Sequence, residues 1–308
     1  MHKKISIIGA GNVGSTTAGF IAMQGLGDVV LVDVDEGKAK GKALDIMHSM
    51  PIEEKDIIIQ GTADFREIKN SDIVIIAAGL PRRPGMTRED LLKKNSEIVE
   101  NISKEIKKYS PKAIMIVVTN PLDAMVYKAW KITEFPKERV IGMGNSLDTT
   151  RFKALIAQET KSSVKDVDAM VIGCHSCDLM VILKEHAKVK DKLLSKILKK
   201  DKIEQTVEKT RHAGDEIVGF LKEGSAYFAP AKAITAIVEA IVHDKKKIIP
   251  CSVLCESEYG AHNIFLGVPV VIGKNGAEKI VEIELSKEEK EEMKKSIEYV
   301  KVLVKQLS

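Results

Sequence analysis

Residues 4–14 read Lys4-Ile-Ser-Ile-Ile-Gly9-Ala-Gly11-Asn-Val-Gly14, a short apolar run followed by a glycine-rich turn. A stretch with helical apolar periodicity, residues 13–24, comes directly after it. In such a strand–turn–helix unit the first glycine makes a tight turn, the second lets the backbone approach a pyrophosphate, and the third lets the helix pack on the strand. Free N–H groups at the helix N-terminus would face the phosphates. The stretch predicts a dinucleotide site formed by Gly9, Ala10, Gly11, Asn12, Val13 and Gly14.

A second apolar strand, residues 29–33, ends at Asp33, nineteen residues after Gly14. A carboxylate at this position is suited to bind the two ribose hydroxyls of an adenosine moiety. It would also repel a 2′-phosphate, which favours NAD over NADP as the cofactor. A tight turn without a ligand is the alternative, but the glycines, their strand and helix, and the acid together favour NAD.

Strands and helices continue to alternate as far as residue 145. We predict further strands at 57–60, 72–78, 113–118 and 139–142, and helices at 37–49, 88–109 and 125–131. The strands are continuous apolar runs, which is typical of a parallel sheet buried on both faces. Residues 1–145 are therefore predicted to form an α/β domain that binds NAD, with a Rossmann-type doubly wound parallel sheet.

The regular alternation of predicted strands and helices ends at Ser146. Helices are expected at 147–158, 192–199, 203–219 and 229–242, and strands at 169–173, 180–183, 253–254 and 268–283. Asn275-Gly276 is a hairpin turn signal, and Ser286 with Glu289 forms a capping box that opens a terminal helix. Residues 146–308 are thus predicted to form an α+β catalytic and substrate-binding domain.

The composition excludes several classes of partner. The 308 residues carry 48 basic and 44 acidic side chains, for a net charge of +4, and only 4% are aromatic, so we expect no nucleic acid. No apolar run reaches the roughly 18–20 residues that span a bilayer. The lysine-rich segment 184–202 is interpreted as a solvated helix face rather than a membrane-surface helix. The start of the chain has no signal-peptide pattern, which favours a cytoplasmic protein.

The four cysteines, Cys174, Cys177, Cys251 and Cys255, are expected to be reduced in that compartment. The Cys174-His-Ser-Cys177 spacing is compatible with a redox pair or half of a zinc site. A zinc site would need the other two cysteines as its remaining ligands, and we expect no metal.

A loop with three arginines follows the predicted strand 72–78. Residues 79–91 contain Arg82, Arg83 and Arg88, broken into a loop by prolines and glycine. Open α/β sheets bind ligands at the carboxyl ends of their strands, and arginine binds carboxylates through two parallel hydrogen bonds. A solvated basic turn is the alternative, but after a strand of this sheet the loop favours an anion, in particular a dianion.

His175 is the candidate acid/base residue, because it follows an apolar strand and so lies at a strand end. A buried structural histidine is the alternative. Asp148 and Arg151 are three residues apart at the start of a predicted helix and share one face. An aspartate beside an imidazole fixes its tautomer and stabilises the protonated ring, and an arginine nearby can hold a carboxylate. Asn120, before Pro121 at a strand end, is suited either to bind a substrate oxygen or to form a turn.

The chain resembles the lactate/malate dehydrogenase family over nearly its whole length, and most of all its malate dehydrogenases with lactate-dehydrogenase-like sequences. The segments that carry the resemblance are Ile8-Gly-Ala-Gly-Asn-Val-Gly14, Gly79-Leu-Pro-Arg-Arg-Pro-Gly-Met-Thr-Arg88, Val118-Thr-Asn-Pro121, Leu147-Asp-Thr-Thr-Arg-Phe152, Gly224-Ser-Ala-Tyr-Phe-Ala-Pro230 and Gly267-Val-Pro-Val-Val-Ile-Gly-Lys-Asn-Gly276.

The resemblance implies a role for each catalytic and substrate residue. His175 takes the hydroxyl proton while the C2 hydride passes to NAD, and Asp148 supports the imidazolium. Arg151 clamps the carboxylate next to the reacting carbon, and Arg88 comes down with a lid and polarises the carbonyl. Arg82 is implied to bind a second carboxylate, as in malate enzymes, whereas lactate enzymes carry glutamine there.

The resemblance also implies a cofactor set, a substrate and an assembly. Asn95, Val118, Thr119 and Asn120 would touch NAD, and Asn120 would also touch substrate. The implied substrate pair is malate and oxaloacetate, with a place in the tricarboxylic acid cycle, and the implied assembly is a homodimer or homotetramer. The chain departs from the family after His175, where Gly-Asp is usual and Ser176-Cys177 stands.

Three other functions are alternatives to the one that the resemblance implies. A lactate or broad 2-hydroxyacid dehydrogenase would share the site and differ in substrate. A non-catalytic NAD-binding sensor would keep the fold and lose turnover through the altered turn after His175. An NAD-requiring glycosidase would need a metal-binding cysteine or histidine after Asn120, and Pro121-Leu-Asp123 offers none.

Overall fold

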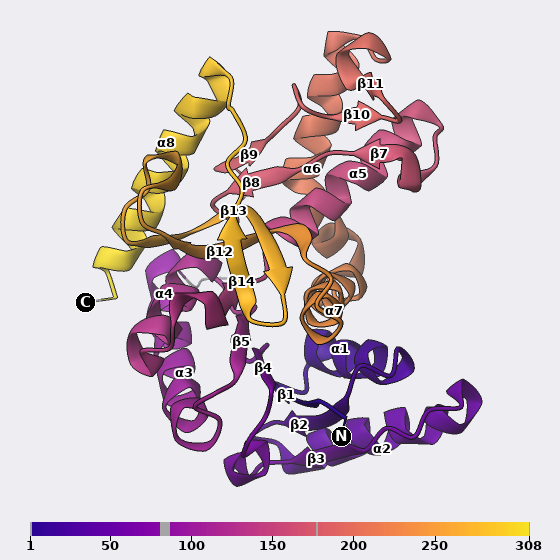
Figure 1. Cartoon of the computed structure of the whole chain (residues 1–308), viewed down its shortest axis with the longest axis vertical. Coiled ribbons are helices and arrows are strands. Elements are labelled where there is room, and N and C mark those ends of the chain that lie inside the picture. Colours follow the sequence, from indigo (N-terminus) through magenta and orange to yellow (C-terminus); the bar gives the residue numbers. More distant parts are fainter. Residues whose placement is uncertain (1, 81–86, 177, 308) are drawn as a thin grey trace.

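The structure is a computed structural model that describes residues 2–80, 87–176 and 178–307 (Figure 1). In its first half, six parallel strands lie in the order β3-β2-β1-β4-β5-β6. Their bounds are β1 Lys4–Ile8, β2 Asp28–Val32, β3 Ile59–Thr62, β4 Ile73–Ile76, β5 Ile114–Val117 and β6 Val140–Gly142. The predicted doubly wound parallel sheet is confirmed. The strand order reverses between β1 and β4, where such sheets open a crevice for ligands.

The side chains of the central strands alternate between two cores. Ile7 and Ile75 belong to the core that also takes in α1 and α2, and Ile8 and Ile76 belong to the core that takes in α3 and α4. Because successive residues point to opposite faces, strands covered on both faces are apolar throughout. The helices are α1 Asn12–Met23, α2 Glu36–Glu53, α3 Arg88–Tyr109 and α4 Leu122–Thr133.

The second half extends the same sheet with antiparallel strands. β12 pairs with β6 through Ser252 and Gly142, and β13 pairs with β8 through Gly267 and Gly173. A Cβ on Gly142 would lie 2.8 Å from the Cβ of Ser252, so this junction requires glycine. The strands are β8 Val171–Gly173, β9 Met180–Ile182, β12 Lys247–Cys255, β13 Ile264–Gly273 and β14 Gly276–Ile280.

Four helices surround these strands. They are α5 Asn145–Thr160, α6 Lys200–Leu221, α7 Phe228–Val242 and α8 Lys287–Lys305. α7 packs against α1, α5 packs against α6, and α8 packs on β9, β13 and α4 (Figure 1). The predicted capping box of α8 and the predicted turn between β13 and β14 are both present, with Gly276 at φ +98°. None of the helices among the described residues is long and apolar enough to cross a membrane.

The helix predicted at 192–199 is wrong. The chain forms instead a small sheet of β7 Val167–Asp168, β10 Lys188–Val189 and β11 Lys192–Leu193, then a short 3₁₀ helix, Leu194–Lys196. Buried and exposed residues alternate from Ala187 to Lys190, which is the period of a strand, and Lys190 turns the chain at φ +55°. Lys188, Lys190 and Lys192 are exposed, but on a hairpin rather than on a helix face, whereas Lys184 is only 16% exposed and forms ion pairs. α6 begins only at Lys200.

Other elements differ from their predictions in length or in position. The strand predicted at 253–254 has nine residues, because it pairs along its whole length with β13. The third strand lies at 59–62 rather than 57–60.

Candidate active site

The glycine-rich turn between β1 and α1 leaves room at one glycine and none at the other two. A Cβ on Gly9 would lie 2.7 Å from the backbone nitrogen of Ala78, and a Cβ on Gly14 would lie 1.9 Å from the carbonyl oxygen of Gly9. A Cβ on Gly11 would meet nothing within 4 Å. Gly11 is also the N-cap of α1 and supplies no side chain to its first-turn N–H groups. The turn therefore presents backbone donors to open space, as an anion site requires.

Asp33 lies directly after β2 and faces this turn. Its Oδ2 accepts a hydrogen bond from the backbone nitrogen of Ala10 at 2.7 Å, and its Oδ1 accepts one from that of Asp35 at 3.1 Å. The side chain is 12% exposed, and Lys38 Nζ lies 3.4 Å from Oδ2. The carboxylate is thus fixed in direction at the edge of the crevice.

The ends of β4 and β5 meet at the same crevice. Thr119 donates a hydrogen bond from Oγ1 to the carbonyl oxygen of Ala78 at 2.6 Å. The buried Asn95 donates to the carbonyl oxygen of Asn120 at 2.7 Å and accepts from the backbone nitrogen of Leu80 at 2.8 Å. Val118 is hydrogen-bonded through its nitrogen to β4. The predicted cofactor residues Asn95, Val118, Thr119 and Asn120 therefore lie together.

His175 lies just beyond the end of β8, beside the first turn of α5. Its Nδ1 is 2.6 Å from Oδ2 of Asp148, whose side chain is fully buried. Burial opposes protonation of His175, but the charge of Asp148 and the hydrogen bond to it outweigh this effect and raise the pKa of His175 above its usual value. The ring lies so close to Gly144 that a Cβ there would be 2.8 Å from Cγ of His175.

Arg151 completes this group one helical turn after Asp148. Its Nη1 is 3.3 Å from Oδ1 of Asp148, and its side chain is 16% exposed. Within the part of the chain that the structure describes, its buried Nε has no hydrogen-bond partner. A guanidinium with unused donors beside an imidazole is suited to hold a carboxylate there.

Two predicted substrate residues are not placed. Arg82 lies outside the described residues, as do Arg83 and Cys177. Arg88 is the first residue of α3, but its side chain also lies outside what the structure describes.

Sequence reasoning missed three residues that hold the backbone around His175. Asp123 in α4 accepts a hydrogen bond from the backbone nitrogen of His175 at 3.1 Å and one from Ser252 Oγ at 2.6 Å. Burial raises the pKa of Asp123, although its hydrogen-bond donors lower it. Ser296 in α8 accepts from the backbone nitrogen of Cys174 and donates to the carbonyl oxygen of Leu179, both at 2.6 Å. The one sequence signal was an acid, Asp123, in an otherwise apolar helix start.

A cavity of about 360 Å³ opens beside the imidazole. His175 and Ser176 line it together with Asn120 and Asp123, and α8 closes it from the side with residues that include Tyr299. The predicted acid/base residue and the predicted substrate amide thus border one space.

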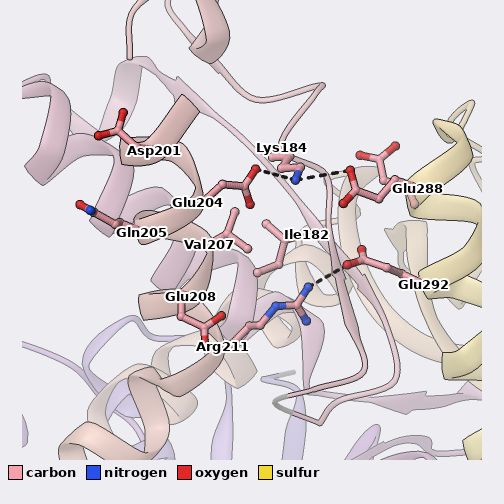
Figure 2. Close-up of a pocket in the computed structure, with 11 residues that line it drawn as sticks. Ile182, Lys184, Asp201, Glu204, Gln205, Val207, Glu208, Arg211, Glu288 and Glu292 are labelled. Atoms are coloured by element: carbon pink, nitrogen blue, oxygen red, sulfur yellow. Dashed lines mark hydrogen bonds and ion pairs between the residues drawn. The ribbon is translucent and has the colours of Figure 1, made fainter. Parts of the chain in front are cut away.

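A second pocket, of about 420 Å³, lies between α6, β9 and α8, and none of the predicted site residues lines it. Figure 2 shows its two cations turned toward acids on the helices: Lys184 Nζ lies 2.8 Å from Glu204 and 3.5 Å from Glu288, and Arg211 Nη2 lies 3.0 Å from Glu292. Arg211 also donates to the carbonyl oxygen of Met180. These ion pairs tie α6 and α8 to the strand that follows the His175 turn.

Cys174, Cys251 and Cys255 are buried free thiols. Burial raises the pKa of each of these thiols, which makes the thiolate rare. Among the described residues, no group of three or more histidine, cysteine, aspartate or glutamate side chains is placed to hold a metal ion.

A doubly wound parallel sheet with a glycine-rich turn after β1, together with a histidine–aspartate pair after β8, is typical of NAD-dependent dehydrogenases. Within that class, the chain belongs to the lactate/malate dehydrogenase family. The model of the family's NAD-binding domain matches residues 3–142, and that of its α/β C-terminal domain matches residues 145–307.

Known proteins are similar to this chain over almost its whole length. A malate dehydrogenase of Bacillus licheniformis is 48% identical over 309 residues, covering 100% of this chain and 99% of that protein. The crystal structure of Cryptosporidium parvum malate dehydrogenase is 41% identical with a TM-score of 0.96, covering 100% of this chain and 99% of that one. A lactate dehydrogenase from the same organism, complexed with lactic acid and β-nicotinamide adenine dinucleotide, is 40% identical with a TM-score of 0.96, covering 100% and 98%.

Proposed function

We propose that the protein is an NAD-dependent malate dehydrogenase that interconverts (S)-malate and oxaloacetate. The observation that carries the proposal is the group formed by His175, Asp148 and Arg151, in which a buried carboxylate holds the imidazole at 2.6 Å and the guanidinium at 3.3 Å. Relatives named malate dehydrogenase match 97% to 100% of the chain. Arg82, at the position that distinguishes malate from lactate enzymes, favours a dicarboxylate over lactate.

The described residues fit NAD. The open space over Gly11 and the uncapped N-terminus of α1 suit a pyrophosphate, and Asp33 at the end of β2 suits the adenosine ribose. Asn95 and Thr119 fix the backbone at the ends of β4 and β5, and Asn120 lines the cavity that His175 also lines. When bound, NAD supplies the nicotinamide that accepts the hydride from C2 of the substrate.

His175 is proposed to move the substrate proton. Because Asp148 holds Nδ1, Nε2 is the nitrogen left to take the hydroxyl proton in oxidation and to return it in reduction. The imidazolium that forms lies beside a buried negative charge, so the cation is stabilised while it exists. Arg151 would hold the carboxylate adjacent to the reacting carbon and orient C2 toward the nicotinamide.

Arg82 and Arg88 are proposed to complete the site from the loop that precedes α3. Arg88 would stabilise the developing charge on the carbonyl oxygen. Arg82 would bind the distal carboxylate, and an arginine left unpaired in a closed site would disfavour a monocarboxylate.

The Arg82→Gln variant tests the substrate assignment, with Arg83→Gln as the matched control that removes the neighbouring charge. We expect Arg82→Gln to reduce the kcat/KM ratio of oxaloacetate to pyruvate by about 10²-fold, since truncation removes a charge-assisted pair. Arg83→Gln should leave the ratio near that of the natural protein. An unchanged ratio in Arg82→Gln would show that Arg82 does not select the substrate.

We further propose a division of the chain near residue 145 into cofactor and catalytic domains, and a homodimer or homotetramer. The assembly is supported by apolar side chains that α2 leaves outside, with Leu44 50%, Met47 40% and Ile52 85% exposed. The buried free thiols are in keeping with a reducing cytoplasm, where a malate dehydrogenase would serve the tricarboxylic acid cycle. Sedimentation as a monomer at micromolar concentration would contradict the assembly.

A further inference from the structure

We propose that Lys38 is a specificity-determining residue of the coenzyme site, which gives this site an affinity for the 2′-phosphate of NADP(H) that Asp33 alone would prevent. The inference deepens the proposed function and rests on its coenzyme site. It concerns the adenosine end only and does not depend on which hydroxy acid is the substrate.

The first support is the position of the lysine relative to Asp33. Lys38 Nζ lies 3.4 Å from Oδ2 of Asp33, the carboxylate proposed to receive the adenosine ribose. The lysine lies in the first turn of α2, and its backbone nitrogen donates to the N-cap side chain of Asp35 at 3.0 Å. The cap fixes where the lysine leaves the helix, so the ammonium is held on the side of α2 that faces the ribose.

The second support is the state of the carboxylate itself. Both oxygens of Asp33 already accept backbone hydrogen bonds, from Ala10 and from Asp35, so the group cannot turn away from a phosphate. An unpaired carboxylate in this fixed direction would repel a 2′-phosphate. With Lys38 beside it, part of that negative charge is offset. The ammonium can also donate a hydrogen bond to the phosphate.

The third support is the direction of α2. The helix has 18 residues, and its positive N-terminal end lies at the same place as Lys38. Two acidic side chains share this end of the helix: Asp35 is engaged as the N-cap, and Glu36 is paired with Lys40 at 2.9 Å. Lys38 is 43% exposed, which leaves the ammonium accessible to a ligand in the crevice.

The test compares Lys38→Met with Lys40→Met in the full-length protein. Lys40 lies on the same helix and carries the same charge, but pairs with Glu36 rather than Asp33. Dissociation constants for NADH and NADPH are measured by fluorescence titration without substrate, and 2′,5′-ADP and 5′-AMP serve as competitors. For Lys38→Met we expect the ratio of the NADPH to the NADH dissociation constant to rise about tenfold, as for loss of one charge-assisted hydrogen bond. For Lys40→Met the ratio should stay within about twofold, since an exposed pair contributes little.

A double-variant cycle sharpens the assignment. Asp33→Asn should strengthen NADPH binding, and combining it with Lys38→Met should remove most of that gain, because the two side chains act on one phosphate. An unchanged ratio in Lys38→Met, or an equal change in Lys40→Met, overturns the inference. Failure of NADH itself to bind would instead overturn the coenzyme site and the proposed function with it.

Discussion

Asp148 carries the central charge of the site, because it is fully buried and touches both His175 and Arg151. A buried carboxylate is costly unless it is paired and hydrogen-bonded. Here the imidazole and the guanidinium share that task, so protonation of His175 is favoured in the folded protein. The same contact therefore affects both stability and proton transfer.

The Asp148→Asn variant is expected to lower kcat for oxaloacetate reduction by about 10²-fold or more, because the imidazolium loses its counter-charge. Reduction needs protonated His175, so its rate falls as pH rises through the pKa of His175, and this falling limb should move to lower pH in the variant.

The raised pKa of His175 also affects how the stability of the fold depends on pH. The protonated pair stabilises the fold fully below the usual histidine pKa of 6.5 and loses its effect as pH rises through the higher folded value. Thermal unfolding at several pH values checks the effect on stability, and pH–rate profiles check the effect on kcat. A falling limb at the same pH in Asp148→Asn and in the natural protein would contradict the role of Asp148.

Gly11 and Gly14 of the nucleotide turn are expected to respond differently to alanine. Gly11→Ala should weaken NADH binding by about tenfold or more with little change in Tm, because its Cβ meets no protein atom within 4 Å and would occupy the place of the pyrophosphate. Gly14→Ala should lower Tm strongly, because its Cβ would lie 1.9 Å from the oxygen of Gly9.

Gly19→Ala is the matched control for the turn glycines, since Gly19 lies in the same helix with nothing within 4 Å of its Cβ. It should stabilise the protein by about 0.5–1 kcal/mol through helix propensity. Calorimetry and NADH titration separate the variants. Equal losses of NADH affinity in Gly11→Ala and Gly19→Ala would contradict the placement of the pyrophosphate.

Residue patterns predicted the local parts of the site but not its long-range supports. The glycines and Asp33 could be predicted from a motif because their neighbours in sequence define their surroundings. The pairing of Asp148 with His175 spans 27 residues and was predicted from their places at a helix start and a strand end. Asp123 could not, because its partners His175 and Ser252 lie 52 and 129 residues away. No local pattern distinguishes such an aspartate from any acid in a first helical turn.

At the scale of elements, the backbone at Cys174, His175 and Leu179 is held by parts of the chain that are distant in sequence. α4 contributes Asp123, β12 contributes Ser252, and α8 contributes Ser296, which bonds both ends of the turn. The family usually has glycine and aspartate after the histidine, whereas this chain has Ser176-Cys177 there. The contacts from α4 and α8 hold the backbone on either side of the His175 ring, which reaches Asp148 at 2.6 Å.

The Ser296→Ala variant tests this support. It leaves the nitrogen of Cys174 and the oxygen of Leu179 without their partner, so we expect a loss of about 1–3 kcal/mol in stability. We also expect a lower kcat with an unchanged NADH dissociation constant, because only the histidine turn loosens. Ser103→Ala is the control, since Ser103 is buried in α3 and its hydroxyl has no partner among the described residues. A kcat equal to that of the natural protein in Ser296→Ala would contradict the positioning role.

Periodicity located most elements, and it failed where the local pattern was ambiguous. The bounds of α3 agree with the prediction because its helical pattern is long and its N-terminal cap is strong. The stretch 192–199 was predicted as a helix because leucine and isoleucine are interleaved with lysine there. Its short strand partner β10 is set by tertiary pairing, which propensity does not reveal.

At the scale of the whole molecule, one sheet joins the two halves of the chain. The parallel strands end at the nucleotide crevice, and the antiparallel strands β12, β13 and β8 carry the sheet on to His175. The alternation of strands and helices predicted the first half, but the junctions at Gly142–Ser252 and Gly173–Gly267 depend on pairings between distant segments. His175, beyond the end of β8, lines the same cavity as Asn120.

The proposed reaction is the transfer of hydride between NAD and a four-carbon hydroxy dicarboxylate. The most direct measurement is the steady-state rate of NADH oxidation by the purified protein with oxaloacetate and with pyruvate. We predict a kcat/KM for oxaloacetate at least about 10²-fold above that for pyruvate, as expected when one substrate leaves a cationic group of the site unpaired. An equal or higher value for pyruvate, or NADH binding without turnover of either substrate, would contradict it.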